Sequence, residues 1–136
     1  MKVSFWDTAG QERYRAITKA YYRNANVVLL AFSFSLNLMI DNDWFLEISE
    51  MVPEDSLYFL VCTQIDRDNQ GFTAAGMKNI PQKCNIPEFI KKKLGHVVFN
   101  VSAKEGWGID VLKTEIARQC AEKFENSHVS FNSYSM

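Results

Sequence analysis

Three runs of consecutive hydrophobic residues form the framework of this chain. They span residues 26–34, 56–62 and 96–101, and they are continuous rather than alternating with polar positions. Continuous apolar runs of this length are typical of strands that are covered on both faces, as in a parallel sheet. A shorter segment, residues 3–6, predicts one further strand ahead of them.

Helical periodicity lies in the intervals between these runs. In residues 43–51, hydrophobic side chains recur at intervals of four and three positions, and Pro53 then ends the helix. The side chains on this stripe are Trp44, Ile48 and Met51. Residues 87–94 predict a short helix, with Pro87 in its first turn and Gly95 just past its end.

The clearest helix covers residues 109–124, where Asp110 in the first turn complements the helix dipole. Its apolar stripe consists of Ile109, Leu112, Ile116, Cys120 and Phe124. Strands that alternate with helices predict βαβ units with right-handed crossovers. We therefore predict an α/β fold of three layers in residues 1–124, with a parallel sheet flanked by helices. Residues 67–86 predict a long loop, and residues 125–136 a flexible tail.

Composition narrows the class of protein. The 136 residues suffice for one domain, and 15 basic against 16 acidic residues leave no basic face for a nucleic acid. Three widely spaced cysteines and two histidines argue against a disulfide framework or a zinc site and suit a reducing compartment. The longest apolar stretch is too short to span a bilayer. These features predict a cytoplasmic chain with no transmembrane segment and no nucleic-acid partner.

The most specific motif is the run W-D-T-A-G-Q-E-R-Y at residues 6–14. A lone D-x-x-G is typical of a simple turn, but nine consecutive matching residues favour common descent. The run resembles the strand-to-switch junction of the Ras superfamily of GTP-hydrolysing switches, and its tryptophan narrows the resemblance to the Rab branch.

This resemblance implies three roles around the phosphates of GTP. Asp7 would hold Mg²⁺ through a water, since Mg²⁺ prefers one or two carboxylates and keeps several waters. Gly10 would bring its backbone N–H against the γ-phosphate, an approach that a side chain would prevent. Gln11 would be catalytic by orienting the attacking water, as the corresponding glutamine does in Ras.

A second motif, T-Q-I-D at residues 63–66, follows the second apolar run and resembles the N/T-K-x-D sequence that reads guanine. The resemblance implies that the carboxylate of Asp66 accepts two hydrogen bonds from the guanine N1–H and exocyclic amine. Thr63 and Gln64 belong to the same guanine-binding motif, although Gln64 stands where lysine is commoner; some Rho-type relatives also carry glutamine there. By itself, an aspartate at a strand end is more often a turn or cap residue.

A third motif, S-A-K at residues 102–104, follows the last apolar run. It resembles the family loop in which Ser102 and Ala103 help to bind guanine, with the Ala103 N–H meeting guanine O6. The stem of Lys104 would cover the base. The sequence S-A-K alone is uninformative, and its order and spacing after the other two motifs support the resemblance.

Two aromatic residues suggest a partner surface. Residues 21–25 resemble a further Rab signature, usually with glycine where Asn24 stands. Trp6 and Tyr21 match two of the three aromatic positions on which Rab effectors and regulators rest. The alternative is that such residues only pack a helix against the sheet, which we favour for Tyr22. For Trp6 and Tyr21 both interpretations stay open.

The phosphate-binding sequence G-x-x-x-x-G-K-[S/T] occurs nowhere in the 136 residues, and neither does the threonine-bearing first switch. The resemblance therefore implies an N-terminally truncated Ras-like fold that lacks its first two strands. GTP or GDP and Mg²⁺ are the family's ligands, but we do not expect this chain to retain them tightly. The last residues contain no cysteine for a prenyl anchor, so no lipid anchor is expected.

Two functions from different classes follow. One is a Rab-like small GTP-binding protein that binds and hydrolyses GTP as a vesicle-traffic switch. The other is a catalytically inactive remnant that serves as a binding module for Rab effectors or regulators. In either case we expect residues 3–6 to shift inward and pair with residues 26–34 through a right-handed crossover, which would complete a sheet of four parallel strands.

Overall fold

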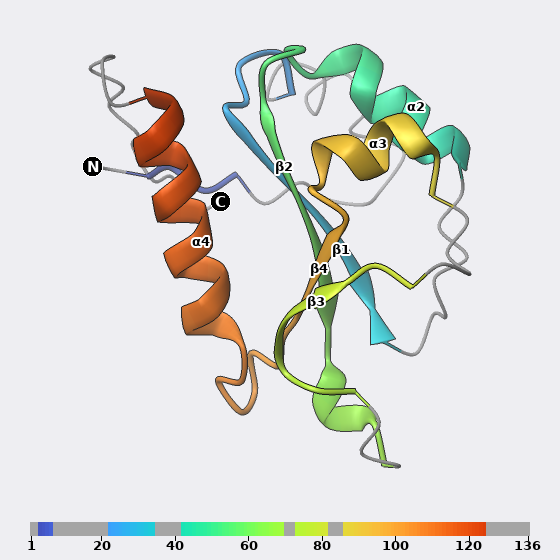
Figure 1. Ribbon diagram of the computed structural model, residues 1–136, viewed down its shortest axis with the longest axis vertical. Coiled ribbons are helices and arrows are strands. Elements are labelled where there is room, and N and C mark those ends of the chain that lie inside the picture. The colour runs from blue at the N-terminus through green and yellow to red at the C-terminus, as the bar shows by residue number, and fades with distance from the viewer. Residues whose placement is uncertain (1–2, 7–21, 35–41, 70–72, 82–85, 125–136) are drawn as a thin grey trace.

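The computed structural model describes residues 3–6, 22–34, 42–69, 73–81 and 86–124. A four-stranded sheet with the order β1-β2-β4-β3 lies between helices on both faces (Figure 1). Its strands are β1 (Val27–Ser33), β2 (Leu57–Thr63), β3 (Gly76–Asn79) and β4 (Val97–Asn100). Strands β1, β2 and β4 run parallel, which confirms the strands predicted from the three apolar runs.

The helices divide between the two faces of the sheet. Helices α2 (Asn42–Met51) and α3 (Glu88–Lys93) cover one face, and α4 (Ile109–Phe124) covers the other (Figure 1). The predicted three-layer α/β architecture is therefore confirmed. Gly95, with φ +63°, lies just past the end of α3, as predicted. Within the described residues, no helix is long and apolar enough to cross a membrane.

Strand β2 explains why its sequence shows no alternation. Tyr58, Leu60 and Cys62 pack into the cluster beneath α2 and α3. Phe59 and Val61 point the other way, into the cluster beneath α4. Both faces of the strand are covered, so both sets of positions are apolar.

Helix α4 seals the second cluster with the predicted stripe. Leu112 and Cys120 are buried, and Ile109 and Ile116 pack against the cluster. Phe59 and Phe99 meet beneath the helix with their ring centroids 5.8 Å apart. Burial of these side chains fixes α4 on the sheet next to β2 and β4.

The predicted stripe of α2 is confirmed at Ile48, and it omits the buried Phe45. The residues buried by this part of the chain are Phe45, Ile48 and Val52, whereas Met51 is half-buried. The side chain of Trp44 lies outside the described ones. Phe45 lies three positions before Ile48 and therefore on the same side of the helix, so the buried face includes a residue that the predicted stripe left out.

Residues 67–86 were predicted as a loop, and this is wrong for β3. The strand pairs antiparallel with β4, from Gly76 opposite Asn100 to Asn79 opposite Val97. Met77 is its single large apolar side chain, and it is exposed. Backbone pairing with β4, rather than burial of side chains, holds this strand in the sheet.

The expected shift of residues 3–6 into the sheet is also wrong. These residues form no strand, and β1 is the outer strand of the described sheet, paired with β2 alone. Leu29 and Ala31 of β1 are exposed on the face that α4 covers elsewhere. The side chains that an added strand placed on that face would stay exposed beside Leu29 and Ala31. Pairing with β1 would therefore bury little hydrophobic surface there.

Candidate functional site

The two predicted guanine motifs meet where β2 and β4 end. Thr63 closes β2, and a 3₁₀ turn, Ile65–Arg67, follows it. The Val101 N–H donates to the Cys62 carbonyl over 2.8 Å, and the Ile65 N–H donates to the Val101 carbonyl over 3.3 Å. These backbone bonds extend the pairing of the two strands into the loops, as expected for the carboxyl ends of parallel strands.

A hydrogen bond between side chains joins the two motifs. The Ser102 hydroxyl donates to Asp66 Oδ1 over 2.7 Å and accepts the Glu105 N–H over 3.2 Å. Ser102 has no exposed surface, so its hydroxyl is held in one place. Of the described residues, none donates a hydrogen bond to Asp66 Oδ2. The carboxylate is thus anchored through one oxygen and available through the other.

The loop from Ser102 to α4 is a tight hairpin. The Ser102 N–H donates to the Trp107 carbonyl over 2.9 Å, and the two residues form an isolated β-bridge. Gly108, with φ +71°, passes so close to Asn100 that a Cβ would overlap the Asn100 carbonyl oxygen. Only glycine fits there. The hairpin leaves Ala103 and Lys104 exposed.

Gln64 is tied to the end of β1. It has the left-handed conformation, with φ 61° and ψ 34°, and its Oε1 accepts a hydrogen bond of 2.9 Å from Ser33 Oγ. Thr63 Oγ1 donates to the Phe32 carbonyl over 3.2 Å. Ser33 belongs to no predicted motif, and it reaches Gln64 because β1 and β2 pair with Ser33 opposite Thr63.

The segment that leads into β3 is attached to residues next to the site. Asn100 Nδ2 donates to the Ala74 carbonyl over 3.0 Å, and the Thr73 N–H donates to Asp68 Oδ2 over 2.6 Å. These bonds connect residues 73 and 74, just before β3, to Asp68 at the end of the 3₁₀ turn and to Asn100 of β4. Part of the segment that was predicted as a loop is therefore fixed to Asp68 and Asn100, each of which lies two positions from a guanine motif.

Cys62, next to Thr63, is a core residue rather than a nucleophile. Burial raises the pKa of its thiol to about 11, so the thiol stays protonated at neutral pH. The described residues contain no group of three side chains that could hold a metal ion. The predicted magnesium residue Asp7 lies outside them.

The other switch residues are only partly covered by the structure. Gly10, Gln11 and Tyr21 lie outside the described residues. Trp6 is described, with 47% of its surface exposed, and Phe5 beside it is 62% exposed. Two neighbouring large aromatic side chains are therefore accessible.

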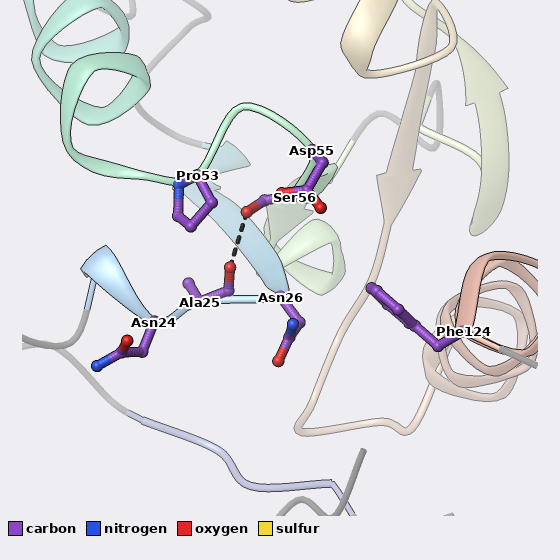
Figure 2. Close-up of a pocket in the computed structure, with 7 residues that line it drawn as sticks. All are labelled: Asn24, Ala25, Asn26, Pro53, Asp55, Ser56 and Phe124. Carbon is purple, nitrogen blue, oxygen red and sulfur yellow. Dashed lines mark hydrogen bonds between the residues drawn. The ribbon is translucent and has the colours of Figure 1, made fainter. Parts of the chain in front are cut away.

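A pocket of about 240 Å³ lies at the opposite end of the sheet, where β1 and β2 begin. Figure 2 shows the ring of Phe124 across this pocket from Pro53. The Ser56 hydroxyl, in its wall, donates to the Ala25 carbonyl over 2.7 Å. None of the predicted guanine-binding residues lines it, and ligands of parallel α/β sheets bind at the carboxyl ends of the strands, so this pocket is not the candidate site.

Comparison with known proteins agrees with the motifs. A profile of the Ras family matches residues 1–122. The Ras-related protein Rab-26 of Rattus norvegicus is 31% identical over 125 residues, which cover 90% of this chain and 45% of that protein. The Ras-related protein SEC4 of Candida albicans is 30% identical over 132 residues, which cover 95% of this chain and 58% of that protein.

The chain spans about half the length of these curated relatives. The family profile nevertheless covers nearly all of the chain, including strands β2 and β4 and the two guanine motifs that follow them. The chain therefore belongs to the Ras family of small GTPases, in its Rab branch.

Proposed function

We propose that this chain carries the base-recognition part of a Rab-type GTP-binding switch, with Asp66 as the residue that selects guanine. The observation that supports this proposal is the 2.7 Å hydrogen bond from Ser102 to Asp66 Oδ1. It joins two motifs that lie 36 residues apart in the sequence and holds one carboxylate in a fixed orientation.

The chemistry of guanine matches this carboxylate. Guanine presents two adjacent donors, the N1–H and the exocyclic amine, whereas adenine has an acceptor in place of the first. A carboxylate accepts both donors of guanine at once. A base that lacks them leaves the anchored carboxylate unpaired, at a cost of about 1–3 kcal/mol.

The surrounding residues fit the edges and faces of a base. The exposed Ala103 would direct its N–H to guanine O6, and the exposed Lys104 would lay its stem over the ring. Gln64, held by Ser33, occupies the place of the usual lysine. A guanine bound here would then meet the polar edge of Asp66 and Ala103 and the side chains of Gln64 and Lys104.

The phosphate chemistry of the switch is proposed from the resemblance alone. When bound, Mg²⁺ would neutralise charge on the phosphates. Asp7 would hold that ion through water, Gly10 would contact the γ-phosphate and Gln11 would orient the attacking water. GTP hydrolysis in a cytoplasmic vesicle-traffic switch is the activity that these roles would serve.

The test is selectivity between bases rather than affinity alone. We would titrate the chain with guanosine, adenosine and xanthosine diphosphates by NMR, in the wild type and in Asp66→Asn. Wild type should prefer guanosine diphosphate. In Asp66→Asn, the amide oxygen keeps the Ser102 hydrogen bond, so the amide N–H₂ faces the base and fits the 2-oxo group of xanthine.

We expect the preference for guanosine over xanthosine diphosphate to reverse, with a change of at least about tenfold in the ratio of affinities. Glu54→Gln is the matched control, because it exchanges an exposed carboxylate for an amide just before β2, away from the site. It should leave the preference unchanged. An Asp66→Asn variant with wild-type base selectivity would contradict the assigned role.

A second candidate function is a binding module for Rab effectors or regulators, and the exposure of Phe5 and Trp6 favours it. The two functions are compatible in an intact switch. The nucleotide titrations distinguish the two functions in this chain. If no nucleotide of any base binds, partner binding through Phe5 and Trp6 is the function that the structure still supports.

A further inference from the structure

The layer formed by α2 and α3 carries charges of opposite sign on its outer surface. Both helices pack into the same buried cluster, and they lie together over one face of the sheet (Figure 1). The exposed charges of α2 are acidic, and those at the end of α3 are basic. This surface is unrelated to the guanine motifs and to Trp6.

On α2, the outward side is centred on Glu50. The helix buries Phe45 and Ile48, which places Glu50 on the opposite side of its axis. Leu46 and Glu47 flank it there, at i−4 and i−3, and Leu46 is 42% exposed. The exposed surface of α2 therefore consists of two carboxylates with one hydrophobic side chain, Leu46, beside them.

On α3, the same arrangement occurs with the opposite charge. The helix buries Ile90, and Leu94 follows it into the same cluster, so Lys92 points outward. Phe89 and Lys93 are also exposed, and Phe89 is 46% exposed. Lys93 Nζ lies 5.2 Å from the centre of the Tyr58 ring, over the buried cluster. Lys92 is therefore the lysine side chain that extends farthest from the sheet.

Within the described part of the chain, neither Glu50 nor Lys92 forms an ion pair. Each stands beside an exposed hydrophobic residue of the same helix. A rotation by 180° about an axis between the helices would bring α2 of one copy onto α3 of another. It would do so twice in one closed interface, because a two-fold contact is reciprocal.

We propose that the α2–α3 layer is a self-complementary interface through which two copies of this chain form a reversible dimer. Glu50 pairs with Lys92 of the partner subunit, and Lys92 with Glu50 of the partner subunit. Leu46 and Phe89 supply the apolar contact between these two pairs. Charge complementarity across a small surface gives specificity and an association that salt weakens.

Charge exchange tests this arrangement directly. Sedimentation equilibrium of the full chain at low salt should show an average mass that rises with concentration from 15.7 kDa towards twice that value. Glu50→Lys alone and Lys92→Glu alone should each weaken self-association by about tenfold or more, because each replaces two attractions with two repulsions.

The decisive variant carries both changes. Glu50→Lys combined with Lys92→Glu restores both pairs in a two-fold dimer, and an equimolar mixture of the two single variants does the same in a heterodimer. Both should therefore recover self-association. Lys113→Glu, an exposed reversal on α4 at the other face, serves as the control and should not change it.

Three results would overturn the proposal. These are a wild type that stays at 15.7 kDa at every concentration, single reversals that leave association unchanged, and a double variant that stays as weak as the single ones. Far-UV circular dichroism of each variant shows whether the fold is intact. Recovery in the double variant excludes misfolding as the cause of the loss.

Discussion

Replacing Ser102 by alanine removes one oxygen atom from the centre of the candidate site. The hydroxyl makes two hydrogen bonds, to Asp66 Oδ1 and from the Glu105 N–H. The substitution changes no backbone preference of importance, because Ser102 lies in a β-bridge rather than in a helix. Its effect should therefore report the two hydrogen bonds.

The magnitude follows from what the lost oxygen leaves behind. A hydrogen bond to a charged group contributes about 1.5–3 kcal/mol to stability, and a neutral one about 0.5–1.5 kcal/mol. Asp66 is half-buried and Glu105 is exposed, so water reaches both groups after the change. We therefore expect the free energy of unfolding to fall by about 1–2 kcal/mol, below the sum of the two bonds.

Urea unfolding followed by far-UV circular dichroism measures this difference. A double-mutant cycle with Asp66→Ala should give a coupling free energy of about 1 kcal/mol, since the two side chains share one bond. Ser49→Ala is the matched control. The Ser49 hydroxyl donates to the Leu46 carbonyl within exposed α2, and its loss should change stability by less than about 0.5 kcal/mol. Additive effects of Ser102→Ala and Asp66→Ala would refute the reasoning.

Two further predictions concern backbone and pH. Gly108→Ala should lower the free energy of unfolding, measured with urea, by more than about 3 kcal/mol, because a Cβ there overlaps the Asn100 carbonyl oxygen. Gly106 has φ +75° but open space around it, so Gly106→Ala should lower the same quantity by only about 1 kcal/mol. The Arg118 guanidinium, which donates hydrogen bonds to Glu115, lowers the pKa of that carboxyl from its ordinary 4.5. The Glu115→Gln variant should therefore be less stable than wild type above pH 4.5. The difference in unfolding free energy between the two proteins should vanish as pH falls through the lowered pKa of native Glu115. A difference that stays constant over that pH range would count against the pairing with Arg118.

The parts of the fold that were predictable are those with a strong hydrophobic signal. Strand β2 is covered on both faces, so its seven residues are nearly all apolar and its position follows from composition alone. Helix α4 buries one side, so its period is clear. Strand β3 gives no such signal, because three of its four residues are exposed and its stability comes from pairing with β4.

The candidate site shows the same division. The meeting of Asp66 and Ser102 follows from the order of the motifs after β2 and β4, since the carboxyl ends of parallel strands lie at one edge. The bond from Ser33 to Gln64 was not predictable, because it depends on the register in which Ser33 lies opposite Thr63. The tight passage of Gly108 past Asn100 likewise depends on the fold and not on any local pattern.

The bond between Ser102 and Asp66 closes a loop of chain, because its two ends lie 36 positions apart. Closing a loop of that length is opposed by chain entropy until β2 and β4 have paired, so the two halves of the site come into existence only in the folded protein. A ligand held by both halves binds the folded chain and not the unfolded one. By mass action, such a ligand raises the free energy of unfolding of residues 57–124. The stability of this part of the chain then depends on the ligand concentration.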